Sequence, residues 1–163
     1  MTFDELNQLE PSRADAEFRR CCGSSRWAAA MAAARPFANL EAMEQRGDEI
    51  WASLGASDWL EAFAAHPKIG AQGPVSSWSA AEQSGMQSAG DEAKARLAML
   101  NAEYESRFGY IFIVCATGKS PSEMLALLKW RMTNDAGREL PIAAAEQQKI
   151  TALRLAKLVE AEE

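Results

Sequence analysis

Histidine occurs once in the 163 residues, at His66 within the sequence AHPKIG. Because imidazole has an unperturbed pKa of about 6.5, a single histidine is the natural candidate for moving a proton near neutral pH. Pro67 follows directly and disfavours the helical backbone conformation for His66. We therefore expect His66 at the end of a helix, either as a proton carrier or as a cap that pairs with the last carbonyls of that helix.

A second polar group follows in the sequence SAAEQ, at Ser79, Glu82 and Gln83. The spacing of Ser79 and Glu82 is that of a capping box, which starts a helix and needs no substrate. A helix start also presents free N–H groups that can bind an anion. Capping and ligand binding are therefore compatible at this segment.

One arginine lies where apolar residues are expected. Ile150 and Leu158 flank Arg154 at four-residue spacing, which places its guanidinium on or beside the apolar stripe of the last helix. Such a side chain either finds a buried acceptor, such as a carboxylate, or extends its charged end to water. Arg131, beside Trp130, raises the same question with weaker support.

The three cysteines do not indicate a metal site. Cys21 and Cys22 are adjacent, Cys115 is far away, and no CxxC pair is present. With only one histidine available, we expect reduced thiols and no metal ligands.

Helices must position these side chains, because Ala, Leu, Glu and Met are interrupted by start and stop signals rather than by strand-like alternation. Thr2 and Glu5 form a capping box, and Ser120 followed by Pro121 is a second strong start. We predict helices that begin at Thr2, Pro11 and Ser79, and helices over residues 26–34, 37–55, 59–66, 90–108, 121–134 and 140–159. Residues 67–78 are expected to form a loop. Residues 110–116 are expected to form an extended connector that is buried between helices.

Expected stop signals are Gly23, Gly55 and Gly109, and Ser57 with Asp58 is expected to open the helix that ends at His66. These signals together predict an all-α fold over residues 1–163. We expect a single-domain compact bundle of about eight to nine helices with no substantial sheet.

Composition excludes several classes of function. The formal charge of −6 is spread along the chain, whereas binding to nucleic acid needs a clustered basic face. No apolar run approaches the roughly 20 residues of a membrane helix, so we expect no membrane partner. The acidic start lacks the apolar core of a secretory signal, and we expect a cytoplasmic protein.

Six stretches cover most of the chain: CGSSRWAAAM with RPF, AHPKIG, SAAEQSGM, LNAEYESRFGYIFIVCATG, RMTNDAGREL and EQQKITALRL. The order HPKIG, EQ and LNxxYxxRFG is specific, although each piece alone is weak. Together, and in this order, the stretches resemble one family, the 2-oxo-4-hydroxy-4-carboxy-5-ureidoimidazoline (OHCU) decarboxylases of urate degradation.

The resemblance implies an all-helical homodimer that decarboxylates OHCU, a small molecule, to (S)-allantoin without a cofactor. By this match His66 is the catalytic histidine and Pro67 its substrate-contacting neighbour. Glu82 and Arg154 complete the implied catalytic set, with Arg131 as the alternative arginine. The remaining implied substrate contacts are Ser79, Gln83 and a largely backbone segment formed by Val114, Cys115, Ala116, Thr117 and Gly118.

We hypothesise that the ring C=N of the substrate accepts the electrons left when CO2 departs, while His66 exchanges the proton of the substrate hydroxyl. Glu82 would orient that hydroxyl or His66, and Arg154 with backbone N–H groups would stabilise developing charge. Two alternatives compete with this interpretation. One is a non-catalytic helical module that binds another protein, and the other is a hydrolase that acts on a related ureido compound.

Overall fold

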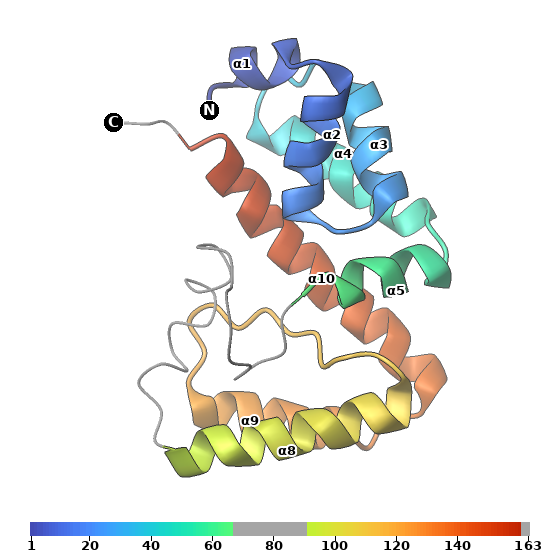
Figure 1. The fold of residues 1–163 in the computed structure, drawn as a ribbon, viewed down its shortest axis with the longest axis vertical. Helices are drawn as coiled ribbons and strands as arrows, with labels where there is room; N and C mark the ends of the chain where they lie inside the picture. The colour runs from blue at the N-terminus through green and yellow to red at the C-terminus, as the bar shows by residue number, and fades with distance from the viewer. Residues whose placement is uncertain (67–90, 161–163) are drawn as a thin grey trace. The chain divides into compact units, whose positions relative to one another are not determined.

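The computed structural model describes residues 1–66 and 91–160, and these residues form eight helices and no strand (Figure 1). The all-α class is therefore confirmed. The chain divides into two compact units, each described by itself below. The first, called the terminal unit, comprises Met1–Ala65 and Gln147–Glu163, and the second, called the central unit, comprises His66–Glu146. The single-domain organisation stays a prediction.

The terminal unit is a set of short helices around an aromatic core. Helix α3 packs against α2, α4 and α5. The Phe18 ring meets the Trp27 ring edge-on, with 6.2 Å between centroids, and both side chains are fully buried, as are Met31 and Met43. The helices are α1 (Phe3–Gln8), α2 (Pro11–Cys21), α3 (Ser25–Ala34), α4 (Leu40–Ser53), α5 (Ala56–Ala64) and the last part of α10 (Ala136–Leu158).

Side-chain caps explain where several of these helices begin. The Thr2 hydroxyl accepts from the Glu5 N–H, and the Glu5 carboxylate accepts from the Thr2 N–H, so the predicted capping box is present. The Ser24 hydroxyl caps α3, and the Asn39 side chain caps α4.

Two boundaries differ from the prediction at Gly55. Helix α4 ends at Ser53, and Gly55 is the N-cap of α5 instead of the stop of α4. The Asp58 carboxylate accepts from the Gly55 N–H at 3.4 Å, which places Asp58 at the third helical position. Helix α5 therefore begins at Ala56, before the predicted Ser57–Asp58 start.

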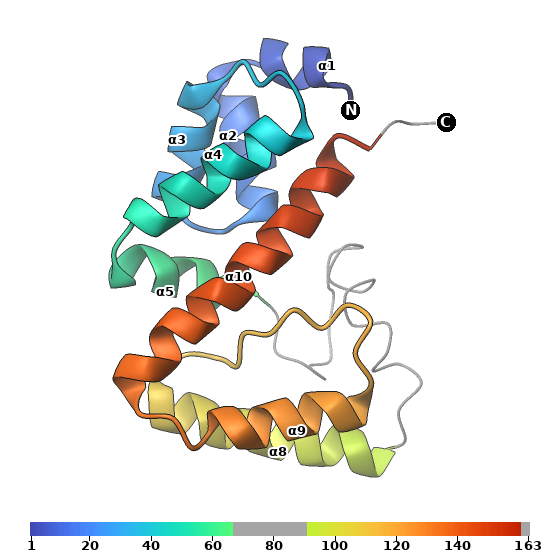
Figure 2. The same ribbon diagram turned by 180° about the vertical axis from the view of Figure 1, so that it is seen from behind.

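The central unit contains α8 (Asp91–Phe108), α9 (Pro121–Arg131) and the first part of α10. Helix α8 packs along α9, as Figures 1 and 2 show. Between them in the chain, residues 111–116 are extended without a strand partner among the described residues, so the predicted connector is confirmed. Its apolar side chains complete one cluster formed by Leu97, Tyr104, Phe112, Val114, Met124 and Leu128.

The boundary between α9 and α10 also differs from the prediction. Ser120 caps α9 and Pro121 is its first residue, as expected, but the helix ends at Arg131. Helix α10 begins at Ala136, because the Asp135 carboxylate accepts from the Arg138 N–H at 2.8 Å. Pro141 consequently lies inside α10 instead of at its first turn.

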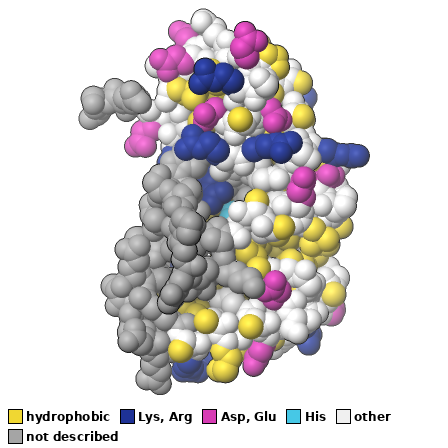
Figure 3. Space-filling view, viewed as in Figure 1, with side chains coloured by type: hydrophobic (Ala, Val, Ile, Leu, Met, Phe, Trp, Pro, Cys, Tyr) yellow, Lys and Arg dark blue, Asp and Glu magenta, His cyan; other side chains and the backbone are white. Residues whose placement is uncertain are grey.

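Residues 1–66 and 91–160 contain no helix that is both long and apolar enough to cross a membrane. Lys and Arg side chains are interspersed with Asp and Glu over the terminal unit on the face drawn in Figure 3. Arg19 pairs with Asp15 and Arg20 with Glu17 along α2.

Candidate active site

His66 directly follows the C-cap of α5 and is half-buried. The Ala65 N–H donates to the Ala62 carbonyl at 3.2 Å, so the backbone itself closes this end of the helix. The predicted place of His66 at a helix end is thus confirmed. Its role as a proton carrier or as a cap stays a prediction.

Four proposed site residues lie outside the described residues: Pro67, Ser79, Glu82 and Gln83. The predicted loop at 67–78 and the helix expected from Ser79 fall in the same range. Their assigned roles therefore rest on the sequence.

The proposed backbone segment, Val114 to Gly118, begins in the buried connector and ends at the surface. Val114 and Cys115 are buried, whereas Thr117 and Gly118 are exposed. The Lys119 N–H donates to the Ala116 carbonyl at 3.0 Å, and Gly118 has a φ of 78°. This combination is that of a type II turn, which needs a positive φ at its third residue and favours glycine there.

The Cys115 peptide is held by two charged side chains. The Cys115 N–H donates to the Glu146 carboxylate at 3.2 Å, and the Lys119 ammonium donates to the Cys115 carbonyl at 2.7 Å. Among the described residues, the N–H groups of Ala116, Thr117 and Gly118 donate no hydrogen bond. These three donors are therefore the ones that a ligand could use.

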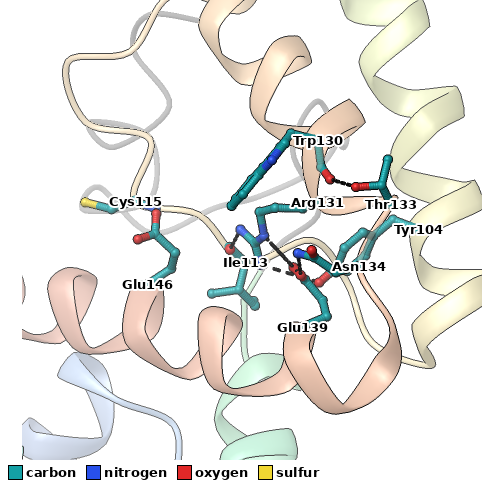
Figure 4. Close-up of polar contacts among 9 residues, drawn as sticks. All are labelled: Tyr104, Ile113, Cys115, Trp130, Arg131, Thr133, Asn134, Glu139 and Glu146. Atoms are coloured by element: carbon teal, nitrogen blue, oxygen red, sulfur yellow. Dashed lines mark hydrogen bonds and ion pairs between the residues drawn. The ribbon is translucent and has the colours of Figure 1, made fainter.

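A buried ion pair lies beside the connector, as Figure 4 shows. Arg131 is 2% exposed and Glu139 is fully buried, and the Arg131 Nε donates to the Glu139 carboxylate at 2.5 Å. The Arg131 Nη1 donates to the Ile113 carbonyl at 2.5 Å, and its Nη2 donates to the Tyr104 hydroxyl at 3.4 Å. The Asn134 amide also donates to Glu139, at 3.4 Å.

Sequence reasoning missed Glu139 and Asn134. The signal was present in RMTNDAGREL, where an acid and an amide follow Arg131 at short spacing. Because the last helix was predicted to start at Leu140, Glu139 was placed outside it, and its pairing with Arg131 was not predicted. All three nitrogens of Arg131 donate within the central unit, so this side chain holds neighbouring protein groups. Which of Arg131 and Arg154 meets the substrate stays a prediction.

Arg154 belongs to the terminal unit and is 8% exposed, so of the two alternatives for this arginine the structure shows the buried one. Its Nη1 donates to the Arg20 carbonyl at 3.4 Å, near the end of α2. One acceptor of this guanidinium is therefore a backbone carbonyl. His66 and Val114–Gly118 belong to the central unit, so the convergence of Arg154 with them stays a prediction.

The cysteines are free and buried. Burial raises the pKa of Cys21 to about 12 and that of Cys22 to about 11, and the positive charge of Arg154 only partly opposes this effect. Such thiols stay protonated at neutral pH and are poor nucleophiles. Within the described part of the chain, no three His, Cys, Asp or Glu side chains gather where they could hold a metal ion.

A family model described as OHCU decarboxylase matches residues 7–156. The chain is 42% identical over 149 residues to the "Uric acid degradation bifunctional protein TTL" of Arabidopsis thaliana, a match that covers 87% of this chain and 46% of that protein. It is 33% identical over 141 residues to the "Putative 2-oxo-4-hydroxy-4-carboxy-5-ureidoimidazoline decarboxylase" of Homo sapiens, covering 83% of this chain and 82% of that protein. The chain thus spans about half the length of the plant relative but most of the human one.

Two solved structures are similar in fold. One, described as "Crystal structure of OHCU decarboxylase in the presence of (S)-allantoin", has a TM-score of 0.81 and 41% identity, and the match covers 89% of this chain and 98% of that one. The other, described as "Crystal structure of (S)-allantoin synthase", has a TM-score of 0.73 at 19% identity and shows the likeness of fold alone. The match covers all of this chain and 56% of that one.

Proposed function

Since the chain belongs to the OHCU decarboxylase family, we propose that it decarboxylates OHCU to (S)-allantoin in uric acid degradation. The observation that carries this proposal is the family match over residues 7–156, together with the 41% identity to a decarboxylase solved in the presence of (S)-allantoin. Family membership favours a decarboxylase over the two alternatives, the non-catalytic interaction module and the hydrolase. The enzyme class is carboxy-lyase.

The reaction replaces the carboxylate of the substrate by a proton. The bond from the ring carbon to the carboxylate breaks, and its electron pair moves toward the adjacent ring C=N, whose nitrogen takes up a proton. The hydroxyl on the same carbon becomes a carbonyl as its proton is released, and a proton is added on one face of the neighbouring carbon. The resemblance implies that this electron sink within the substrate makes a cofactor unnecessary.

We assign the roles as the family motifs indicate. His66 exchanges the hydroxyl proton, and its place immediately after α5 leaves its ring outside the regular helix. Glu82 orients the hydroxyl or His66, while Pro67, Ser79 and Gln83 contact the substrate. Arg154 and the N–H groups of residues 116–118 bind ureido and ring oxygens and stabilise developing charge.

Replacement of His66 tests the function directly. The wild-type chain should accelerate the appearance of the (S)-allantoin circular dichroism signal when OHCU is freshly generated from urate. His66→Asn should lose that acceleration by a factor of at least about 100, the usual scale of general acid–base catalysis. Far-UV circular dichroism checks that the variant keeps its helical content. Near-wild-type rates in the folded variant would refute the role of His66, and an inactive wild-type chain would refute the function.

We also propose that the chain acts as a homodimer in the cytoplasm. The family resemblance supports the dimer, and the three reduced, buried thiols are consistent with a reducing compartment. Light scattering coupled to size exclusion should give twice the mass of the chain. Cell fractionation should recover the protein with cytoplasmic markers.

A further inference from the structure

The connector raises the question of how its backbone polar groups are satisfied. Buried backbone N–H and C=O groups are almost always paired, and an extended segment normally meets this need in a sheet. Residues 111–116 have no strand partner among the described residues, although Phe112, Ile113, Val114 and Cys115 are buried. Side chains must therefore fix this part of the backbone.

Arg131 fixes one end of the buried stretch. Its guanidinium donates to the Ile113 carbonyl and lies over the Phe112 ring, 4.6 Å from the ring centroid. Glu139 holds the guanidinium from another side, and the Tyr104 hydroxyl accepts a third hydrogen bond. A planar group with several fixed donors that is held on three sides defines the position of the carbonyl that it contacts.

Glu146 fixes the other end. Its carboxylate accepts the Cys115 N–H from α10, two residues after the carbonyl that Arg131 holds (Figure 4). Lys119 then donates back to the Cys115 carbonyl, immediately before the turn at Ala116–Lys119. The backbone is thus held on both sides of Val114. The N–H groups of residues 116–118, which follow, are therefore fixed in their direction.

We propose that Arg131 and Glu146 are positioning residues for substrate binding: they hold the Ile113–Cys115 backbone so that the N–H groups of residues 116–118 meet the substrate oxygens. This inference rests on the proposed function, because the oxygens are those of the ureidoimidazoline ring and its substituents. Neither side chain is required to touch the substrate. Hydrogen-bond donors that are fixed before binding lose less conformational freedom when a ligand arrives.

The Glu146 variants give the sharpest test because Glu146 is only half-buried. Glu146→Ala removes the acceptor for the Cys115 N–H, whereas Glu146→Gln keeps an acceptor oxygen at that place. We expect Glu146→Ala to raise KM and the Kd for (S)-allantoin at least tenfold with a smaller change in kcat, and Glu146→Gln to restore most of this loss. Calorimetric titration with (S)-allantoin and steady-state kinetics provide these values.

Arg131→Lys tests the other contact, with Arg35→Lys as its matched control. Arg35 lies in the terminal unit and donates to the Ala32, Leu6 and Leu9 carbonyls, so it also holds backbone carbonyls. Arg131→Lys should weaken (S)-allantoin binding at least tenfold, while Arg35→Lys should lower Tm without changing Kd. If Arg131→Lys does not fold, the Glu146 pair alone decides the proposal.

The outcomes separate the two hypotheses. An active wild-type chain whose Glu146→Ala variant binds (S)-allantoin with unchanged Kd would overturn the positioning role and leave the function intact. Equal losses in Glu146→Ala and Glu146→Gln would also overturn it, because the acceptor would then be irrelevant. An inactive wild-type chain that does not bind (S)-allantoin would overturn the proposed function and this inference together.

Discussion

Two buried arginines have different surroundings in this chain. Arg131 is 2% exposed, and each of its three nitrogens donates to a group of the central unit. Arg154 is 8% exposed and lies near Cys21 and Cys22, whose apolar surroundings keep both thiols protonated at neutral pH. Partial burial strengthens the attraction of a guanidinium for a negatively charged ligand, because the effective dielectric constant is lower there. The contacts of Arg131 suit it to holding the backbone, whereas the binding of substrate by Arg154 stays a prediction.

The two buried thiols should make stability fall at alkaline pH. In the unfolded chain they lose their protons near pH 9, whereas in the folded chain burial raises the pKa of Cys21 to about 12 and that of Cys22 to about 11. Between pH 9 and 11 the folded state therefore binds more protons than the unfolded state, and stability falls as pH rises. The limiting slope is about 1.4 kcal/mol per pH unit for each thiol.

Urea unfolding at a series of pH values measures this slope. The double variant Cys21→Ala with Cys22→Ala should show a shallower loss of stability than the wild type over the same range. The comparison removes the contribution of Tyr104, whose pKa is also raised by burial and which is present in both proteins. Identical slopes would mean that the thiols titrate alike in both states.

Gly23 lies where the chain leaves α2 and passes close to the end of α5. A Cβ at this position would clash with the Cβ of Ala65, the residue before His66. Gly23→Ala should therefore displace the end of α5, cost about 1–3 kcal/mol as overpacking does, and lower the rate of decarboxylation. Gly55→Ala is the control at the other end of α5, because nothing lies within 4 Å of its added Cβ. Equal effects on rate in the two variants would contradict this argument.

At the scale of elements, two start signals were predictable from the sequence, the capping box at Thr2 and the Ser120–Pro121 pair. Thr2, Ser120 and Pro121 begin helices where the sequence indicates, because each contact is local and falls within one turn. The connector at 110–116 was predicted from its apolar composition. Its contacts were not, because Glu146 lies 31 residues from Cys115 and Arg131 lies 18 residues from Ile113. Pairings over such separations are set by packing, which a single sequence does not reveal.

The start of α10 shows the competition between two local signals. Pro141 favours a helix that begins near Leu140, since proline suits the first turn. The helix instead starts at Ala136, because the Asp135 carboxylate caps the Arg138 N–H. The helix therefore includes Glu139, the partner of Arg131. Asp135→Ala should cost about 1 kcal/mol in the free energy of unfolding, and Asp135→Asn should cost clearly less. Urea unfolding monitored by far-UV circular dichroism distinguishes them, and an Asp135→Ala variant as stable as the wild type would contradict the capping role.

At the scale of the whole molecule, one helix belongs to both compact units. Helix α10 contributes residues 136–146 to the central unit and residues 147–158 to the terminal unit. In the central unit it carries Glu139, the ion-pair partner of Arg131, and in the terminal unit it carries the buried Ile150, Leu155 and Leu158. If either unit unfolded, its part of α10 would lose the side-chain contacts that stabilise it. The single domain expected from the sequence stays a prediction, and this shared helix gives a way to test it.

We expect the units to unfold in one cooperative transition. Hydrogen exchange in urea, followed on peptides from α3 and from α8, should give coincident midpoints in the wild type.

Ala145 is exposed and lies near the point where α10 passes between units. Ala145→Pro removes an N–H and obstructs the preceding turn, at a cost of about 3 kcal/mol or more, so the two midpoints should separate. Ala145→Gly, which costs about 1 kcal/mol in helix propensity without breaking the helix, should lower both midpoints together. Separate midpoints in the wild type would show that the continuity of α10 does not couple the units, and the chain would then consist of two domains.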